Sequence, residues 1–255
     1  MRHFPLLLVH EIRMLAVSVA TYSAAVLFLI VMGLFYFLVL SQYDSELHSD
    51  PPTTLYFRMF FIPVFFVVPL LTMKSLAEER RFGTLETLLT TPASALEIVL
   101  AKYFAAYLFY VALWALTLLF PWIAITYLHA NQPDSPLRDT GSLIGGFLFV
   151  CFSGLLYIAI GVFASSLTRN TLVAGMLSFS MLFVLIIGGG LLPKMPLPAD
   201  WLTHIQPAVD YLQTFQHLLD FSSGMVDTRP FFLYASNALL VLGITTLVVE
   251  GRATA

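Results

Sequence analysis

The sequence predicts an all-α integral membrane protein with six transmembrane helices and with both termini on the cytoplasmic side. Three observations lead to this fold class: the composition, the spacing of the charged residues, and the distribution of Lys and Arg between loops. Of the 255 residues, 59% are hydrophobic and 11% are charged, and the mean hydropathy is +0.87. A soluble domain carries about a quarter charged residues. This chain therefore has too little polar surface to face water.

The net charge and the cysteine count exclude two further classes of protein. A formal net charge of -3, with basic residues scattered along the chain, gives no electrostatic footprint for a nucleic-acid partner. Cys151 is the single cysteine and lies in an apolar run. One cysteine cannot form a disulfide or a thiolate metal site within one chain.

The N-terminal stretch "MRHFPLLLVHEIRML" predicts a retained amphipathic helix on the membrane surface. It starts like a secretory signal, with a basic residue followed by a short apolar run. His10, Glu11 and Arg13 interrupt that run before it reaches the length of a signal core, and no small-residue cleavage site follows.

Runs without a formal charge define the transmembrane spans. Five of them reach the roughly 20 residues that a helix needs to cross the hydrocarbon core: 14–43, 103–133, 140–168, 170–193 and 230–249. The second span is shorter, with 15 uncharged residues from Met59 to Met73, so Arg58 must reach the interface by snorkelling. We expect one transmembrane domain, residues 1–255, with spans at about 15–40, 55–74, 98–128, 142–166, 170–193 and 230–249.

The distribution of Lys and Arg predicts the orientation, because cytoplasmic loops carry an excess of these residues. With both termini inside, eight basic residues lie on the cytoplasmic side and four on the outer side. The inner ones are Arg2, Arg13, Lys74, Arg80, Arg81, Lys102, Arg169 and Arg252, and the outer ones are Arg58, Arg138, Lys194 and Arg229.

Prolines and glycines predict local features within the spans. Pro63 and Pro69 in the second span and Pro121 in the third should kink or end their helices, because proline removes a backbone donor and clashes with the preceding turn. Gly141 and Gly145 are spaced for close packing against another helix, although this spacing is common in apolar helices.

The outer segment between the fifth and sixth spans is too long for a simple turn. It runs over 36 residues from Lys194 to Arg229. Within it, "IQPAVDYLQTFQHLLDF" predicts a short outer helix that starts at Pro207 and packs on the membrane domain. Its apolar side would carry Val209, Leu212, Phe215 and Leu219.

Catalytic and cofactor-binding motifs are absent from the sequence. There is no H-E-x-x-H metal motif, no G-x-S-x-G nucleophile and no G-x-x-x-x-G-K-[ST] phosphate loop. The centres of the spans carry no ionisable side chain of the kind that ion-coupled transporters usually use. We therefore expect a non-catalytic chain without a metal or cofactor. If ATP drives it, another chain binds the ATP and the magnesium.

The segment "EERRFGTLETLLTTPAS", residues 78–94, lies between the second and third spans on the predicted cytoplasmic side. Gly83 allows a sharp turn, and the following residues have room for about two helical turns, or 12 Å, before Pro92. Ser94 and Glu97 are spaced for a capping box that opens the third span. In the short helix, Leu85, Leu88 and Leu89 share one face, and Glu86 and Thr90 share the other.

A helix this short is unstable alone in water and must dock against something. Two interpretations follow from the residues. The helix lies on the bilayer or on the protein's own helix ends, with Arg80 and Arg81 setting only the topology. Alternatively, it presents a rigid, charge-flanked surface to a soluble partner.

Residues 73–103, "MKSLAEERRFGTLETLLTTPASALEIVLAKY", resemble the signature of ABC-2 type permeases, the membrane subunits of exporters driven by separate ATP-binding-cassette ATPases. The matching residues are Glu79, Arg80, Gly83, Thr84, Glu86, Leu88, Leu89, Thr91, Pro92 and Lys102. A second stretch, "GMVDTRPFFLY" at residues 224–234, is similar to the branch that includes gliding-motility permeases and the permease of nitrous-oxide-reductase maturation.

The resemblance implies a partner arrangement and a coupling site. Two six-helix subunits, identical or paralogous, would meet in the bilayer, each served by one ATPase subunit. The helix after Gly83 would be the coupling helix, seated in a groove of the ATPase. The implied coupling residues are Glu79, Arg80, Arg81, Gly83, Thr84, Glu86, Leu88, Leu89 and Pro92.

Within that set, Glu86 and Arg80 would make polar contacts with the ATPase, and Leu88 and Leu89 would form the packed face. Gly83 and Pro92 would set the geometry. The expected function is that of a permease subunit of an ATP-driven exporter in the bacterial plasma (inner) membrane, with an unidentified substrate. The alternative is a membrane anchor or scaffold that recruits a cytoplasmic ATPase without transport.

Overall fold

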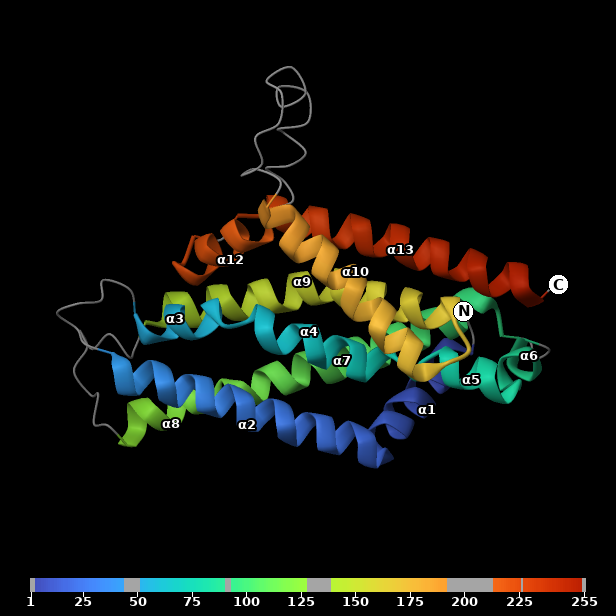
Figure 1. Ribbon diagram of the computed structural model, residues 1–255, viewed down its shortest axis with the longest axis horizontal. Coiled ribbons are helices and arrows are strands. Elements are labelled where there is room, and N and C mark those ends of the chain that lie inside the picture. Colours follow the sequence, from blue (N-terminus) through green and yellow to red (C-terminus); the bar gives the residue numbers. More distant parts are fainter. Residues whose placement is uncertain are drawn as a thin grey trace, which may run out of the picture.

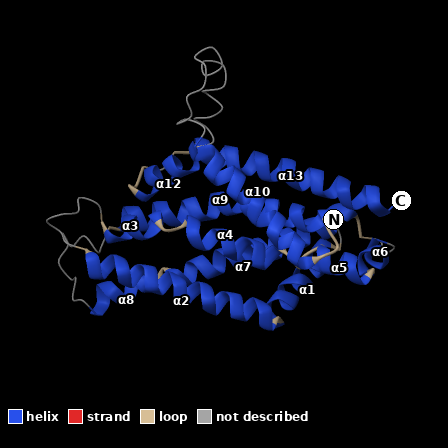
Figure 2. Cartoon of the chain, in the orientation of Figure 1, coloured by secondary structure: helices blue, strands red, loops and turns tan. Residues whose placement is uncertain are grey.

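The regular structure of the described chain is helical, as the sequence predicts (Figures 1 and 2). A computed structural model describes residues 3–43, 51–89, 93–127, 139–191, 213–225 and 227–253. The first half contains α1 (Phe4–Val17), α2 (Val19–Gln42), α3 (Pro52–Arg58), α4 (Phe61–Thr72), α5 (Ala77–Phe82) and α6 (Thr84–Leu89). The second half contains α7 (Ala95–Thr117), α8 (Leu119–Tyr127), α9 (Thr140–Leu167), α10 (Thr171–Leu191), α12 (Thr214–Ser222) and α13 (Arg229–Ala253).

Six stretches of the described chain are long and apolar enough to cross a membrane, which confirms the predicted number. They are Val19–Gln42, Phe61–Phe82, Ala95–Tyr127, Thr140–Leu167, Thr171–Leu191 and Arg229–Gly251. The second differs from the predicted span at about 55–74. Residues before Arg58 form the separate helix α3, and α4 continues through a turn at 73–76 into α5.

Most of the long helices run along the longest axis of the molecule, and α10 crosses them obliquely (Figure 1). Helices α3, α8 and α12 lie at one end, which we call the α3 end. Helices α5 and α6 lie at the other, the α6 end, together with both ends of the described chain (Figure 1).

Two of the three predicted proline effects coincide with helix breaks. The helix ends at Thr117 and restarts at Leu119, just before Pro121, and it breaks at Met59 and Phe60, just before Pro63. In each case the proline lacks the N–H that would bond to the carbonyl four residues earlier. Pro69 instead lies inside α4, which runs on to Thr72.

Helix α9 is the central helix, and glycines let its neighbours approach closely. A Cβ at Gly145 would lie 1.9 Å from the carbonyl oxygen of Phe221 in α12, so the backbones are nearly in contact. This bears out the close packing predicted at Gly145. Further along α9, a Cβ at Gly154 would clash with Tyr110 of α7, and one at Gly161 with Thr72 of α4. Side chains at these positions would push the bundle apart.

Aromatic rings fill the core around α9. The Phe60 ring packs against Trp114 and Phe149, with centroids 5.0 and 5.4 Å away, and the Phe149 ring continues to Phe221 and Tyr234. Edge-to-face and tilted contacts of this kind stabilise the packing beyond the area that they bury. They join α7, α9, α12 and α13 around the start of α4.

Helix α12 packs on the membrane domain, as the sequence predicts, but through a different face. Leu218 and Phe221 are buried, whereas Phe215 and Leu219 are partly exposed. The reason is tertiary: the Phe221 backbone sits against α9, and Thr54 of α3 donates a hydrogen bond of 2.9 Å to the Ser222 carbonyl. The predicted helix start at Pro207, together with Val209 and Leu212, lies outside the described residues.

Candidate functional site

The segment that leads from α4 to α7 forms two short helices, α5 and α6, joined by a turn at Gly83. Helix α5 ends at Gly83, whose φ of +71° lies in the left-handed region, and α6 follows at once. A residue with a Cβ rarely adopts this conformation. The sharp turn predicted at Gly83 is therefore confirmed. The Thr84 hydroxyl donates to the Glu79 carbonyl, 3.3 Å away, and closes the turn.

The start of α5 is fixed by a serine of α9. The Ser165 Oγ accepts hydrogen bonds of 3.0 Å from the backbone N–H groups of both Leu76 and Ala77, and donates to the Met73 carbonyl at 3.2 Å. Free N–H groups at a helix start usually find a capping side chain nearby in the sequence. Here the cap comes from a helix 88 and 89 positions away. The start of α5 is thus attached to the central helix α9.

Arg80 is also bound within the chain. Its Nη1 donates a hydrogen bond to the Ser166 carbonyl, in the last turn of α9. The guanidinium is therefore directed towards α9. The contact of Arg80 with a partner stays a prediction.

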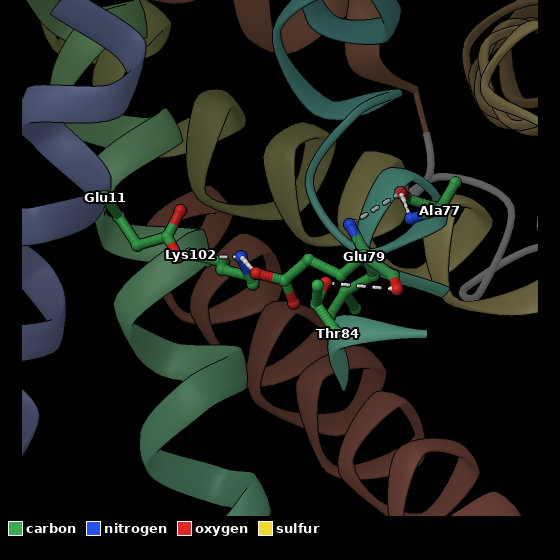
Figure 3. A network of polar contacts seen from close by, with 7 residues as sticks. Glu11, Ala77, Glu79, Thr84 and Lys102 are labelled. Carbon is green, nitrogen blue, oxygen red and sulfur yellow. Dashed lines mark hydrogen bonds and ion pairs between the residues drawn. The ribbon is translucent and has the colours of Figure 1, made fainter. Parts of the chain in front are cut away.

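Lys102 lies between two carboxylates that come from different helices (Figure 3). Its Nζ is 2.7 Å from the Glu11 Oε1 of α1 and 2.7 Å from the Glu79 Oε1 of α5. The Lys102 side chain is 3% exposed, against 19% for Glu11 and 24% for Glu79. Since a buried ammonium needs compensating charge, the two carboxylates hold Lys102 in place. Three helices meet at one nitrogen.

The remaining predicted residues divide into an inner and an outer group. Leu85 of α6 is buried in the protein's own core, at 7% exposure, and Leu88 is half-buried. Arg81, Gly83 and Thr84 are exposed. The side chains of Glu86 and Leu89, and the residue Pro92, lie outside what the structure describes.

Phe82 joins the exposed group, although the sequence analysis did not select it. Its side chain is 67% exposed at the end of α5, and the Arg81 guanidinium lies 5.7 Å from the ring centroid. A large exposed aromatic residue beside a cation is typical of contact surfaces. Phe82 directly precedes the turn residue Gly83, and this position in the sequence could have indicated that its side chain is exposed.

The sequence also gave no sign of the residues that contact α5 and Lys102 from distant parts of the chain. Glu11 and Ser165 were not selected, and Lys102 was noted only as a match to the family signature.

The capping box that opens α7 is confirmed: Ser94 accepts from the Glu97 N–H at 3.3 Å, and Glu97 accepts from the Ser94 N–H at 3.2 Å. Among the described residues, no group of three or more His, Cys, Asp or Glu side chains could hold a metal ion.

Arg81 to Thr84 form an exposed turn. Helix α5, before the turn, is bonded to α7 and α9, and α6, after it, places the buried Leu85 in the core. No described side chain within this segment is set up as a nucleophile or as a metal ligand.

Comparison with known proteins identifies the family. The sequence profile of the family described as ABC-2 family transporter protein matches residues 42–249, which is most of the chain. A search of curated proteins returned no match. The match covers four of the six long apolar helices of the described chain in full and nearly all of Arg229–Gly251, but only the last residue of Val19–Gln42. The chain therefore belongs to the ABC-2 transporter family and is a multi-pass membrane component of such a transporter, non-catalytic and without a cofactor of its own.

Proposed function

We propose that this chain is the permease subunit of an ATP-driven exporter, and that α5, Gly83 and α6 together form its coupling element. ABC permeases in general pair with ATPase subunits. We further propose that two permease subunits, identical or paralogous, assemble in the bilayer and that each coupling element contacts one ATPase. The observation that carries the proposal is the exposed turn at Gly83, fixed to the bundle by Ser165 and Lys102.

The orientation that we propose places the α6 end in the cytoplasm of a bacterium. Lys74, Arg80, Arg81 and Arg169 lie in segments at this end, whereas Arg58 and Arg229 lie in segments at the α3 end. Positive residues concentrate on the cytoplasmic side of membrane proteins. The imbalance supports a cytoplasmic position for the coupling element, where ATP is available.

The proposed roles of the individual residues follow the contacts of the described side chains. Arg81, Phe82 and Thr84 are exposed and form the contact surface for the ATPase. Glu79 and Arg80 instead transmit movement inward, because their side chains bond to α7 and α9. Glu86, Leu89 and Pro92 stay in the proposed set on the strength of the family signature.

The test uses the permease purified together with the ATPase subunit that this proposal assigns to it. Gly83→Pro forces a negative φ at a residue that has +71°. We expect the variant to insert and to keep its helix content, but to lose stimulation of ATP hydrolysis. Glu86→Arg should do the same by placing a positive charge on the coupling helix.

Gly188→Ala in α10 is the control, because a Cβ there meets nothing within 4 Å. It should leave stimulation unchanged. If Gly83→Pro and Glu86→Arg both stimulate the ATPase as the wild type does, the coupling assignment is wrong.

A further inference from the structure

We propose that Lys102 is a positioning residue that fastens the surface helix α1 and the coupling element to one point of α7, so that α1 moves with the coupling element. The inference rests on the proposed function, since it assumes that an ATPase moves α5 and α6. It adds α1 to the helices that move with the ATPase. It also assigns their connection, which we call the joint, to the Lys102 ammonium group between Glu11 and Glu79.

The first support is that α1 lies on the surface of the bundle and packs mainly along α7. None of its residues is buried, and Leu6, Val9, Met14 and Val17 are each at least 60% exposed. Its contacts run along α7, where the Phe4 ring meets the Phe104 ring edge-on at 6.1 Å. The Glu11 to Lys102 ion pair adds a directional bond to this contact, near the C-terminal half of α1, while the His3 backbone bonds to the Glu97 carboxylate of α7 at the start of α1.

The second support is the charge balance at the joint. One ammonium serves two carboxylates, each at 2.7 Å, so the two carboxylate oxygens lie no more than twice that distance apart. Like charges at this range repel unless a cation lies between them. The Glu79 Oε2 atom is buried and has no hydrogen-bond partner in the described residues. Lys102 therefore holds α1 and α5 together against the repulsion of Glu11 and Glu79.

The third support is the continuation of the contacts beyond α7. One and five residues after Lys102, the hydroxyls of Tyr103 and Tyr107 donate to the α9 carbonyls of Leu155 and Cys151, at 3.1 and 3.0 Å. A displacement of α5 is thus passed by Lys102 to α7 and by the tyrosines to α9. Helix α1 is attached at the first step of this series.

The experiment compares five variants in the reconstituted complex with the ATPase, measuring both ATPase binding and the stimulation of ATP hydrolysis. Lys102→Arg keeps a cation that can reach two carboxylates, and should stimulate as the wild type does. Glu11→Gln releases α1 but leaves the Lys102 to Glu79 pair. We expect it to bind the ATPase with unchanged affinity and to lower stimulation on the order of fivefold or more, as typical coupling energies imply.

Lys102→Met leaves two facing carboxylates and should lose stimulation. Part of the activity should return at lower pH, because protonation of one carboxylate removes the repulsion. The groups that face this point are Glu11 and His10 of α1 and Glu79 of α5, while Arg80 is bonded to the Ser166 carbonyl. His10→Gln in the Lys102→Met background should leave this pH response unchanged, and its loss would contradict the carboxylate origin.

The triple variant Glu11→Gln, Glu79→Gln, Lys102→Met removes every charge at the joint and so removes the repulsion. If the ion pairs of Lys102 served only to stabilise the fold, this variant would stimulate the ATPase as the wild type does. We expect it to fold and bind the ATPase but still to lack stimulation. Wild-type stimulation in the triple variant, or in Glu11→Gln, would overturn the proposal.

Failure of the proposed function gives a different result from failure of this inference. If the chain does not couple to an ATPase, the wild-type permease itself neither binds the ATPase nor stimulates its ATP hydrolysis. If only the inference fails, the wild type stimulates the ATPase and the Glu11→Gln variant does so equally.

Discussion

Ser165→Ala tests whether the coupling element is held by the bundle. The substitution removes an Oγ that accepts from two backbone N–H groups, those of Leu76 and Ala77, and that donates to the Met73 carbonyl. Leu76 and Ala77 are both completely buried. Neither water nor lipid can replace the lost acceptor without opening the turn.

The expected cost follows from these two orphaned donors. Each buried polar group left without a partner costs roughly 1–3 kcal/mol. Because the turn at residues 73–76 can relax and weaken this penalty, we expect a total of about 2 kcal/mol for opening the start of α5. That corresponds to hydrogen exchange on the order of thirtyfold faster at these amides.

The assay is hydrogen–deuterium exchange of the purified protein, followed on peptides that cover residues 73–82. Ser166→Ala is the matched control, because the Ser166 hydroxyl donates only to the Phe163 carbonyl within its own helix, at 2.7 Å. The Ser166 carbonyl that accepts from Arg80 is kept in that variant. Equal exchange in Ser165→Ala and Ser166→Ala would refute the reasoning.

Three further predictions concern packing, backbone and pH. Gly145→Leu should lower the thermal unfolding midpoint sharply, because its Cβ would lie 1.9 Å from the Phe221 carbonyl oxygen, whereas Gly188→Leu, with open space at its Cβ, should change it little. Gly83→Ala should cost about 1 kcal/mol in chemical unfolding, since φ is +71° but space is free, and a cost near zero would contradict the left-handed turn. Burial lowers the pKa of His217, so the unfolded chain binds a proton more readily, and stability should fall as the pH drops below about 6.5. Thermal unfolding at pH 8 and pH 5.5 should show a smaller loss for His217→Gln than for the wild type, and an equal loss would contradict this assignment.

Local signals predicted much of the fold. Charge-free runs predicted five of the six spans, because a helix must be apolar over its membrane crossing. The second, Phe61–Phe82, differs from the prediction, because α4 continues through a turn into the charged helix α5. The Ser94 and Glu97 cap, the Gly83 turn and the break before Pro121 depend on residues within four positions, so the sequence alone was sufficient.

The contacts that define the site could not be read in the same way. Glu11 and Lys102 are 91 positions apart, and no periodicity connects them. Glu79 and Arg80 look like surface charges in a polar segment, yet their side chains bond to Lys102 of α7 and to the Ser166 carbonyl of α9. On α12, the buried face is chosen by close packing against Gly145 rather than by the helix's own pattern. Tertiary packing determines which way these side chains point and which face of the helix is buried.

The division of the coupling segment into an inner and an outer part changes how its variants should be interpreted. Substitutions at Arg81 or Phe82 alter an exposed surface and should weaken ATPase binding first. Substitutions at Glu79 or Arg80 break internal contacts and should weaken stimulation while binding persists. Measuring both quantities for each variant separates the two parts.

The most direct test of the central claim is a site-specific crosslink between the coupling element and the ATPase. Cys151→Ser removes the single cysteine, and Thr84→Cys then places a reactive thiol at the exposed start of α6. Thr126→Cys, exposed on α8 at the α3 end, is the control. We predict that Thr84→Cys crosslinks to the ATPase in membranes and that Thr126→Cys does not. Crosslinking from Thr126→Cys, or none from Thr84→Cys in a complex that binds the ATPase, would contradict the account.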